Sequence, residues 1–455
     1  MKPLPRLALA MPANGSEPST AALAWLAGLT ARHWRVQHFR SRACPTATEA
    51  VGQVGGLPGR HLDAWLMPES VLRSVFLKGT RQTDLALVEG TLENNPDLPI
   101  RPPYDLPGAL SPIVEALKLP TIAVVECPRR DSFHLPRVPS DVDAVFLDGL
   151  EHPADFEFFK RMVMLATKKP VVGAVEAIPE VRDALRQAPR DSPIPEALVH
   201  RLGASFLKFA DLGLIHSLSR SRHWDWEEPE PVSCGTRRFR VAYAQDEAFG
   251  AYFPDTLEAL ESLGAELVEF SPIRDERLPD RVDLVMIGCG FPDLHARALS
   301  QNLSLMTELR GHVCRGHRIY SEGGGTAYLG RSMLIGGKRV AGAGILPLDA
   351  ELLPDPAPPT PVSRTLMRDC WLGPAGTDVR GYKSGRWKLV PGADPLDCPG
   401  CFGPLTIEDD MYFRHHAVGG LIHLHLAARP EVVAAFAGPH FASLTLPLPT
   451  GWPCP

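Results

Sequence analysis

The chain has 455 residues, of which 44% are hydrophobic and 22% are charged, with a formal net charge of −6. This length is too great for one typical core and predicts two or three domains, while the interspersed charges argue against a nucleic-acid partner. No apolar run approaches the roughly 18 residues of a membrane span, and nine scattered cysteines favour a reducing cytoplasm.

The first half of the chain alternates short apolar runs with stretches long enough for crossover helices. The runs are Leu7–Ala10, Leu85–Val88, Thr121–Val125, Ala144–Leu147 and Val171–Val175. This spacing predicts an α/β domain with a doubly wound parallel sheet over residues 1–215. The polar, aperiodic residues 216–238 are expected to form an interdomain linker, in which Trp224 and Trp226 are packing anchors.

A second series of alternating strands and helices is expected over residues 239–455. Its predicted elements are strands at Arg240–Ala244, Leu267–Phe270 and Leu284–Ile287, and a helix near Asp255–Leu263. The proline-rich segment Pro347–Pro361 is expected to be a long loop, and Leu421–Ala427 leads to a short closing helix. The predicted fold is therefore two α/β domains in succession.

The segment Ile319–Gly330 has the pattern of a strand end, then Glu322 and three glycines, then the start of a helix. Turns of this kind expose a nucleophile in α/β enzymes, with backbone N–H groups converging on it. The turn resembles Tyr-Ala-Glu-Cys-Gly-Gly-Leu-Met-Tyr-Leu of the cobyrinate a,c-diamide synthase family, and Gly323 stands where that family has its cysteine.

The resemblance extends over most of the chain. It is strongest in Val241–Leu260, in Leu263–Glu276 and in Gly288–Leu299, where the family has Gly-Gly-Gly-Tyr-Pro-Glu-Leu-His-Ala-Glu-Ala-Leu. Residues Leu421–Ala427 resemble the family's Tyr-Leu-His-Leu-His-Phe-Ala. Fainter matches are Arg35–Phe39, Arg60–Met67 and Asp84–Gly90. The resemblance implies a P-loop-like, ATP-dependent amidoligase domain followed by a class I glutaminase-like domain, with an oxyanion loop at 288–290 and the catalytic histidine at His423.

The expected nucleotide loop departs from what phosphate binding needs. A Gly-x-Gly-Lys-[Ser/Thr] loop lets the backbone approach the phosphates and adds a lysine charge, but Glu17 and Pro18 replace that glycine and lysine here. The residues that stay for a vestigial site are Gly15, Ser19, Thr20, Glu89 and Glu126. The alternative is a strand–helix turn capped by Ser16 or Ser19. ATP and magnesium are expected only if the ligase domain is active.

The expected glutaminase pocket is also incomplete, because Gly323 deletes the nucleophile. The vestigial pocket consists of Gly288, Cys289, Gly290, Glu322, Gly323 and His423. Cys289 is interpreted as a small buried cysteine and His423, without a thiol, as a core histidine. The family's His-Glu-Phe-His segment appears here as Tyr382–Gly385.

Cys398 and Cys401 form a Cys-x-x-Cys pair that would suit a structural zinc or a redox role. Completing a zinc site would need two further ligands, and the candidates are His415 and His416, or Cys370 and Cys454. The alternative is a proline-glycine turn with two incidental thiols. His423 and His425 are two residues apart and would share one face of a strand, so they could share an ion or be an inherited pair.

These observations favour a non-catalytic family member that binds a tetrapyrrole or corrinoid, or that acts as a protein partner or homodimer. The first alternative is an active ATP-dependent amidoligase, making the a,c-diamide in cobalamin-type biosynthesis without a cysteine glutaminase. The second alternative is a zinc- or redox-active adaptor that uses Cys398 and Cys401.

Overall fold

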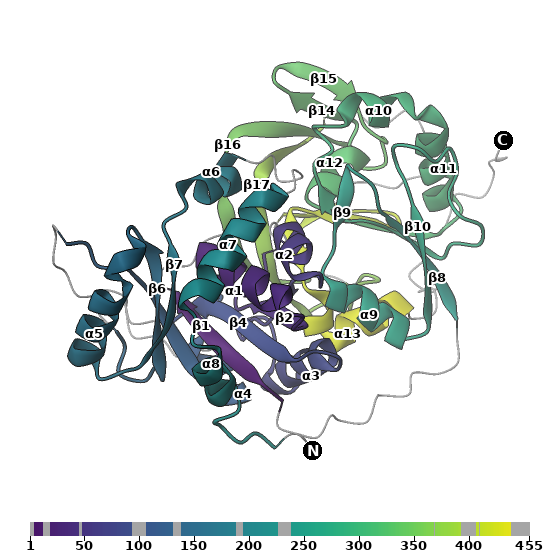
Figure 1. Cartoon of the computed structure of the whole chain (residues 1–455). Coiled ribbons are helices and arrows are strands. Elements are labelled where there is room, and N and C mark those ends of the chain that lie inside the picture. Colours follow the sequence, from purple (N-terminus) through teal and green to yellow (C-terminus); the bar gives the residue numbers. More distant parts are fainter. Residues whose placement is uncertain are drawn as a thin grey trace, which may run out of the picture. The chain divides into compact units, whose positions relative to one another are not determined.

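The computed structural model describes residues 4–11, 19–44, 48–92, 106–130, 138–187, 194–225, 238–367, 369–392, 406–408 and 410–437. The chain divides into two compact units, Met1–Glu230 and Pro231–Pro455 (Figure 1). Among the described helices, none has both the length and the apolar character needed to cross a membrane.

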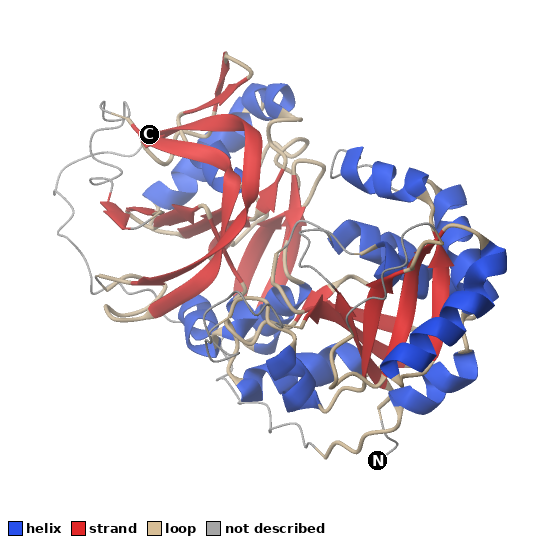
Figure 2. Cartoon of the chain, turned by 90° about the vertical axis from the view of Figure 1, so that its left-hand side faces the viewer, coloured by secondary structure: helices blue, strands red, loops and turns tan. Residues whose placement is uncertain are grey.

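The first unit contains a seven-stranded sheet in the order β3-β2-β4-β1-β5-β6-β7, and every neighbouring pair is parallel (Figure 2). Its strands are β1 (Arg6–Met11), β2 (Val36–Arg40), β3 (Arg60–His61), β4 (Leu85–Thr91), β5 (Thr121–Glu126), β6 (Ala144–Leu150) and β7 (Val171–Glu176). Its helices are α1 (Thr20–Ala31), α2 (Thr48–Gly55), α3 (Glu69–Thr80), α4 (Ser111–Leu117), α5 (Phe156–Thr167), α6 (Pro179–Gln187), α7 (Glu196–Phe209) and α8 (Leu212–Ser219). The five apolar runs predicted as strands are confirmed.

Helices cover both faces of this sheet. In β5, Ile122 and Val124 pack in one core with α1 and α7, whereas Ala123 and Val125 pack in another core with α5. Since successive residues of a strand point to opposite faces, these two cores lie on opposite sides of the sheet, as expected for a doubly wound fold.

The chain expected to be a linker begins as part of the first unit. Helix α8 runs to Ser219, past the expected start at residue 216. The indole N–H of Trp224 then donates to the carbonyl of Ala116 at 3.2 Å, and its ring meets Phe76 edge-on. Trp224 is therefore a packing anchor, as predicted, whereas Trp226 lies outside the described residues.

The second unit contains a seven-stranded sheet in the order β10-β8-β11-β13-β20-β19-β18. Neighbours from β10 to β20 are parallel, and β19 and β18 are added antiparallel. The strands are β8 (Phe239–Ala244), β10 (Ala265–Phe270), β11 (Leu284–Ile287), β13 (Arg318–Glu322), β18 (Thr406–Glu408), β19 (Met411–Arg414) and β20 (Ala417–Gly420). The helices are α9 (Pro254–Ser262), α10 (Ala296–Gln301), α11 (Leu303–Cys314), α12 (Gly324–Leu329) and α13 (Pro430–Ala437). The predicted strands at β8, β10 and β11 and the helix at α9 are confirmed.

Two smaller sheets complete the second unit, one in the order β12-β9 and one in the order β15-β14-β16-β17-β21. Their strands are β9 (Phe249–Ala251), β12 (Cys289–Gly290), β14 (Ser332–Ile335), β15 (Lys338–Ala341), β16 (Leu348–Thr365), β17 (Asp378–Pro391) and β21 (Ile422–Leu424).

The prediction of a long loop at Pro347–Pro361 is wrong, because β16 covers most of that segment. β16 pairs with β14 only from Asp349 to Glu351, so its proline-rich part has a described partner on one side alone, in β17. The register of β16 also shifts between Leu352 and Ala357. Prolines are tolerated in edge strands and at bulges, where no ladder hydrogen bond is lost.

Candidate functional site

The predicted turn after β13 is present and keeps an unusual backbone conformation. Gly323 has φ +51° and ψ −115°, and α12 begins at the next residue. The Gly323 N–H donates to the carbonyl of Gly420 at 2.8 Å, and the Ser321 and Thr326 hydroxyls are 3.0 Å apart beneath the turn. Because a positive φ strains residues with a side chain, glycine suits this position.

Cys289 fills the space that a side chain on Gly323 would need. Cys289 begins β12, directly after the carboxyl end of β11, and is paired with Ala251. A β-carbon on Gly323 would lie less than 3.0 Å from Sγ of Cys289 and 3.5 Å from Nε2 of His423. The sulfur of Cys289 therefore lies where the turn would otherwise present its own side chain.

His423 connects this sulfur to a carboxylate. It lies on β21, opposite Tyr382 of β17, and is 4% exposed. Its Nε2 contacts Sγ of Cys289, and its Nδ1 is 3.2 Å from Oε2 of Glu322. The Nδ1 contact is an ion pair whose angle falls short of a good hydrogen bond, and such alignments often tighten only when substrate binds.

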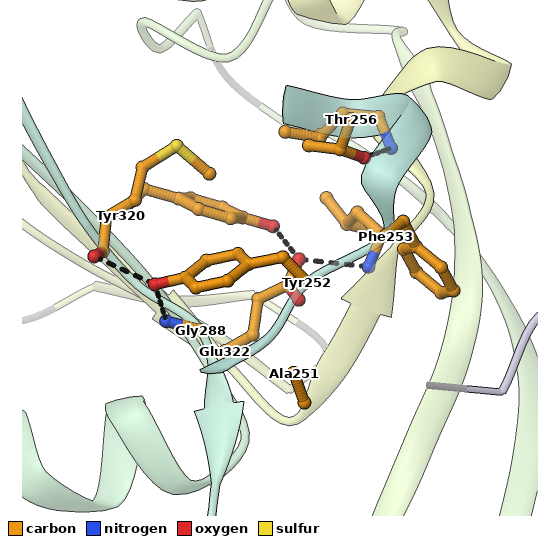
Figure 3. Close-up of a pocket in the computed structure, with 10 residues that line it drawn as sticks. Ala251, Tyr252, Phe253, Thr256, Gly288, Tyr320 and Glu322 are labelled. Atoms are coloured by element: carbon orange, nitrogen blue, oxygen red, sulfur yellow. Dashed lines mark hydrogen bonds between the residues drawn. The ribbon is translucent and has the colours of Figure 1, made fainter. Parts of the chain in front are cut away.

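Glu322 is held in place by two further donors. The Tyr320 hydroxyl donates to Oε1 at 2.5 Å, and the Leu424 N–H donates to the same oxygen at 3.0 Å. Figure 3 shows Tyr320 and Glu322 pointing toward each other across a small pocket. One carboxylate oxygen is thus fixed by neutral donors, while the other faces the imidazole.

Tyr252 anchors the loop that carries Cys289. Its hydroxyl accepts the Gly288 N–H at 2.9 Å and donates to the carbonyl of Met286 at 3.1 Å (Figure 3). The Gly288 N–H, which the family resemblance places in an oxyanion loop, is therefore bonded to a tyrosine in this structure. These bonds fix the backbone immediately before the cysteine.

The electrostatics of the cluster favour a protonated imidazole. Burial opposes the charge, but the adjacent Cys289 and Glu322 raise the pKa of His423 to about 10. Burial raises the pKa of Cys289, and His423 works against that shift. Burial and the Glu322 charge hold the pKa of Tyr320 far above its usual value, so Tyr320 acts only as a hydrogen-bond donor.

The ligand atoms of Cys289, Glu322 and His423 lie within 4.8 Å of one another, close enough to raise the question of a metal ion. The sulfur, however, contacts Nε2 and the carboxylate contacts Nδ1. An ion bound at Nε2 would be on the opposite side of the ring from that carboxylate contact. The arrangement is better suited to proton transfer between a thiol and an oriented histidine.

In the first unit, Ser19 and Glu89 come together, but their contacts are internal to the protein. Ser19 caps α1, its Oγ accepting the Ala22 N–H at 3.0 Å. The Ser19 N–H donates to Oε1 of Glu89 at 2.7 Å, and Oε2 of Glu89 is 2.9 Å from Nε2 of His38. The predicted cap at Ser19 is confirmed.

Two of the other predicted nucleotide-site residues, Thr20 and Glu126, lie within the described part of the chain. Thr20 is the first residue of α1, and Glu126 is exposed at the end of β5. Gly15, Ser16, Glu17 and Pro18 lie outside the described residues.

The remaining cysteine and histidine candidates do not form one described centre. Cys398, Cys401 and Cys454 lie outside the described residues, so the zinc or redox site stays a prediction. The rings of His415 and His416 lie 4.2 Å apart in the turn between β19 and β20. The backbone of Cys370 pairs with that of Gly373 in an isolated antiparallel β-bridge.

His423 and His425 have different surroundings, so the structure does not place them around one ion. His425 is buried against Phe253, with ring centroids 4.5 Å apart, and its Nε2 is 3.8 Å from Oδ2 of Asp255.

The sequence reasoning did not find the contact between Cys289 and His423, nor the support given by Tyr252. A signal for the first was present in the resemblance, because this chain has Cys289 where the family has glycine and Gly323 where it has cysteine. The fold shows that these two positions face each other.

Known proteins match both the second unit and the whole chain. Residues 240–396 match the CobB/CobQ-like glutamine amidotransferase domain. The cobyrinate a,c-diamide synthases of Salmonella typhimurium strain LT2 and Syntrophotalea carbinolica are each 26% identical to this chain, over 93% and 95% of it and 96% and 98% of their own lengths. The hydrogenobyrinate a,c-diamide synthase of Streptomyces coelicolor is also 26% identical, over 95% of this chain and 97% of its own. The chain therefore has a CobB/CobQ-like amidotransferase domain in the second of its two units and is similar, over nearly its whole length, to cobyrinate a,c-diamide synthases.

Proposed function

We propose that this chain hydrolyses the side-chain amide of glutamine in its second unit and supplies the ammonia for amidation of a tetrapyrrole carboxylate. The observation that carries the proposal is the buried pair of His423 and Glu322, which lies behind the turn at Gly323 within the amidotransferase domain. The proposal replaces the interpretation that the sequence alone favours, in which the protein is not a catalyst.

Stability alone gives little reason to keep this pair. Desolvating two charges is costly, and replacing a buried ion pair by packed apolar residues is often neutral or stabilising. Here the carboxylate also accepts hydrogen bonds from Tyr320 and Leu424, which orient it toward the ring. Orienting a histidine with a carboxylate is what general acid–base catalysis requires.

The relatives' names suggest the acceptor of the ammonia, namely the carboxylates of a cobyrinate- or hydrogenobyrinate-type macrocycle. The described residues do not fit a nucleotide phosphate at the start of α1. The Ser19 N–H there is bonded to the Glu89 carboxylate, which would repel a phosphate at close range. The proposal therefore assigns glutamine hydrolysis to this chain and leaves the ATP-dependent step out of its mechanism.

The test is glutamine turnover by the purified full-length protein, followed as glutamate and ammonia release, with His423→Gln as the control for contaminating glutaminase. The proposal expects turnover in the wild type and a loss of roughly 10²-fold or more in the variant, the usual effect of removing a general base. Equal, background-level release from both proteins would refute it. Adding ATP, Mg²⁺ and cobyrinate then shows by mass spectrometry whether this chain alone forms the diamide.

A second candidate is a non-catalytic partner subunit that binds the macrocycle. The internal bonding of Glu89 to Ser19 and His38 favours it for the first unit, because these contacts occupy an acid that the family resemblance places at the nucleotide site. Cobyrinate binding by a protein that is inert toward glutamine would support this candidate over the first.

A further inference from the structure

Resting on the proposed amide hydrolysis, we infer that Cys289 is the nucleophile of this site, and that it attacks from the loop after β11 instead of from the turn at Gly323. The sequence places a cysteine at 289 and a glycine at 323, the reverse of the family pattern. Cys289 lies in β12 and Gly323 in the turn between β13 and α12, and only the folded chain brings them together.

The steric relationship is the first support. The turn at Gly323 keeps φ +51°, and a β-carbon there would lie less than 3.0 Å from Sγ of Cys289. Such a β-carbon would also be 3.5 Å from Nε2 of His423. Cys289 therefore brings its sulfur to the same side of the same imidazole that a residue at 323 would face.

The chemistry around the sulfur is the second support. Nε2 of His423 contacts Sγ, and Glu322 lies at Nδ1. The backbone N–H of Gly324, like His423, works against the rise that burial causes in the pKa of Cys289. A cationic imidazole and an N–H donor both stabilise a thiolate, which is the nucleophilic form of cysteine.

Cys127 of the first unit shows what burial does to a cysteine here without such partners. It is 5% exposed, and burial together with the nearby Asp155 and Asp148 raises its pKa to about 12. Cys127 is therefore a matched control, since it is a buried thiol with carboxylates but no histidine among the causes of its shift.

The reaction proceeds through a thioester. His423 already holds the thiol proton on Nε2, as an imidazolium beside the thiolate, so Sγ bonds directly to the amide carbon of glutamine while the carbonyl π electrons move to oxygen. When the carbonyl re-forms, the C–N bond breaks, and the imidazolium proton goes to nitrogen, so that ammonia leaves. Water then attacks the thioester and gives one proton to the neutral His423, and the C–S bond breaks to release the thiolate, so that the imidazolium–thiolate pair is restored.

The decisive probe is 6-diazo-5-oxo-L-norleucine, an electrophile with the shape of glutamine. A thiol that attacks it forms a carbon–sulfur bond as dinitrogen leaves, and the thiol proton ends on the former diazo carbon. The full-length protein is treated with the probe and digested, and the labelled cysteine is mapped by mass spectrometry. The inference expects the label on Cys289, abolished in His423→Gln and unchanged in Cys127→Ser.

Glutamine turnover by Cys289→Ser and Cys127→Ser completes the test. The inference expects a loss of more than about 10³-fold in the first, as for removal of a catalytic nucleophile, and little change in the second. Wild-type turnover that survives Cys289→Ser overturns the inference and leaves the proposed function standing. The wild type could instead be inert toward glutamine and still be labelled at Cys289, with the label lost in His423→Gln. That result would refute the proposed function and would show that the thiol is nevertheless reactive. Labelling elsewhere, or nowhere, overturns the inference.

Discussion

A side chain on Gly323 would bring its β-carbon within 3.0 Å of Sγ of Cys289, so this backbone accommodates a side chain at only one of the two positions. The exchange of glycine and cysteine between positions 289 and 323 is therefore a coupled change. It moves the sulfur from the turn after β13 to β12, while the histidine and the carboxylate keep their places. The coupling can be measured.

Gly323→Ala should lower the free energy of unfolding by roughly 2–4 kcal/mol. About 1–2 kcal/mol comes from a side chain at positive φ, and the remainder from overpacking against Cys289. In a Cys289→Gly background only the first part stays, so the cost should fall to about 1–2 kcal/mol. Urea unfolding of the four proteins in this double-mutant cycle gives the coupling, and strictly additive effects would contradict the steric relationship.

Moving the sulfur back should restore a working site. In the double variant Cys289→Gly/Gly323→Cys, the new β-carbon lies 3.5 Å from Nε2 of His423 and no longer meets another sulfur. Glutamine hydrolysis should stay within about tenfold of the wild type, whereas Cys289→Gly alone should lose roughly 10³-fold or more. Kinetic assays of the two variants, matched for folding by circular dichroism, decide this. Equal inactivity of both would mean that the scaffold no longer accepts a nucleophile on the turn.

The ionisation of His423 should make stability depend on pH in a specific window. Its pKa is about 10 in the folded protein, against 6.5 for the unperturbed group, so protonation stabilises the fold. That contribution is complete below pH 6.5 and disappears as the pH rises through 10. The difference in unfolding free energy between wild type and His423→Gln should therefore shrink between pH 6.5 and pH 10. A difference that stays constant over this range would show that His423 is neutral in the native state.

Cys289→Ala provides the control for that measurement. The interaction with Cys289 is the largest cause that raises the pKa of His423. Without the sulfur, the pKa should fall, and the window of pH-dependent stability should move to lower pH. NMR titration of the histidine ring in both proteins measures the shift directly.

The strands were predictable where burial on both faces leaves a continuous apolar run, as in β5 and β11. β16 was not, because its prolines are the residues that local rules assign to loops. What makes β16 a strand is its long-range pairing with β17 and a register shift that the local composition does not encode. A nonlocal partner outweighed the local preference.

The candidate site was likewise predictable only where the local sequence carries a signal. His423 and Glu322 were found because the sequence around them resembles a known motif, and the structure brings them into contact. The position of Cys289 depends on how the loop after β11 approaches the turn after β13, two neighbouring strands of one sheet. The contact of Ser19 with Glu89 likewise joins residues 70 positions apart. Side chains that meet across strands leave no local spacing signal.

Tyr320→Phe tests whether Glu322 must be held by its hydrogen bonds. The change removes the 2.5 Å donor to Oε1 and leaves only the Leu424 N–H on that oxygen. The carboxylate becomes freer to turn from His423, and kcat for glutamine hydrolysis should drop roughly tenfold with KM little changed, while stability falls by about 0.5–1.5 kcal/mol. Tyr243→Phe is the matched control, because Tyr243 donates to the carboxylate of Glu269 at an exposed position. Equal kinetic effects of the two variants would show that the hydroxyl of Tyr320 does not position Glu322 for catalysis.

Glu89 should stabilise the first unit through its charge. Burial raises its pKa, but the hydrogen bond and charge of His38 and the charge of Arg40 outweigh burial and hold that pKa below 4.5. Its stabilising contribution is therefore present above pH 4.5 and is lost as the pH falls through the lowered pKa. Glu89→Gln should lower the free energy of unfolding by about 1.5–3 kcal/mol at pH 7, the usual contribution of a charge-assisted hydrogen bond. The difference in unfolding free energy from the wild type should disappear on acidification.

Ser19→Ala is the control. It removes the side-chain cap to Ala22 but keeps the backbone N–H that donates to Glu89, so its cost of about 1 kcal/mol should not depend on pH. Unfolding curves of the three proteins between pH 3 and pH 7 separate the two roles, and a pH-independent penalty for Glu89→Gln would show that the acid is neutral in the folded unit.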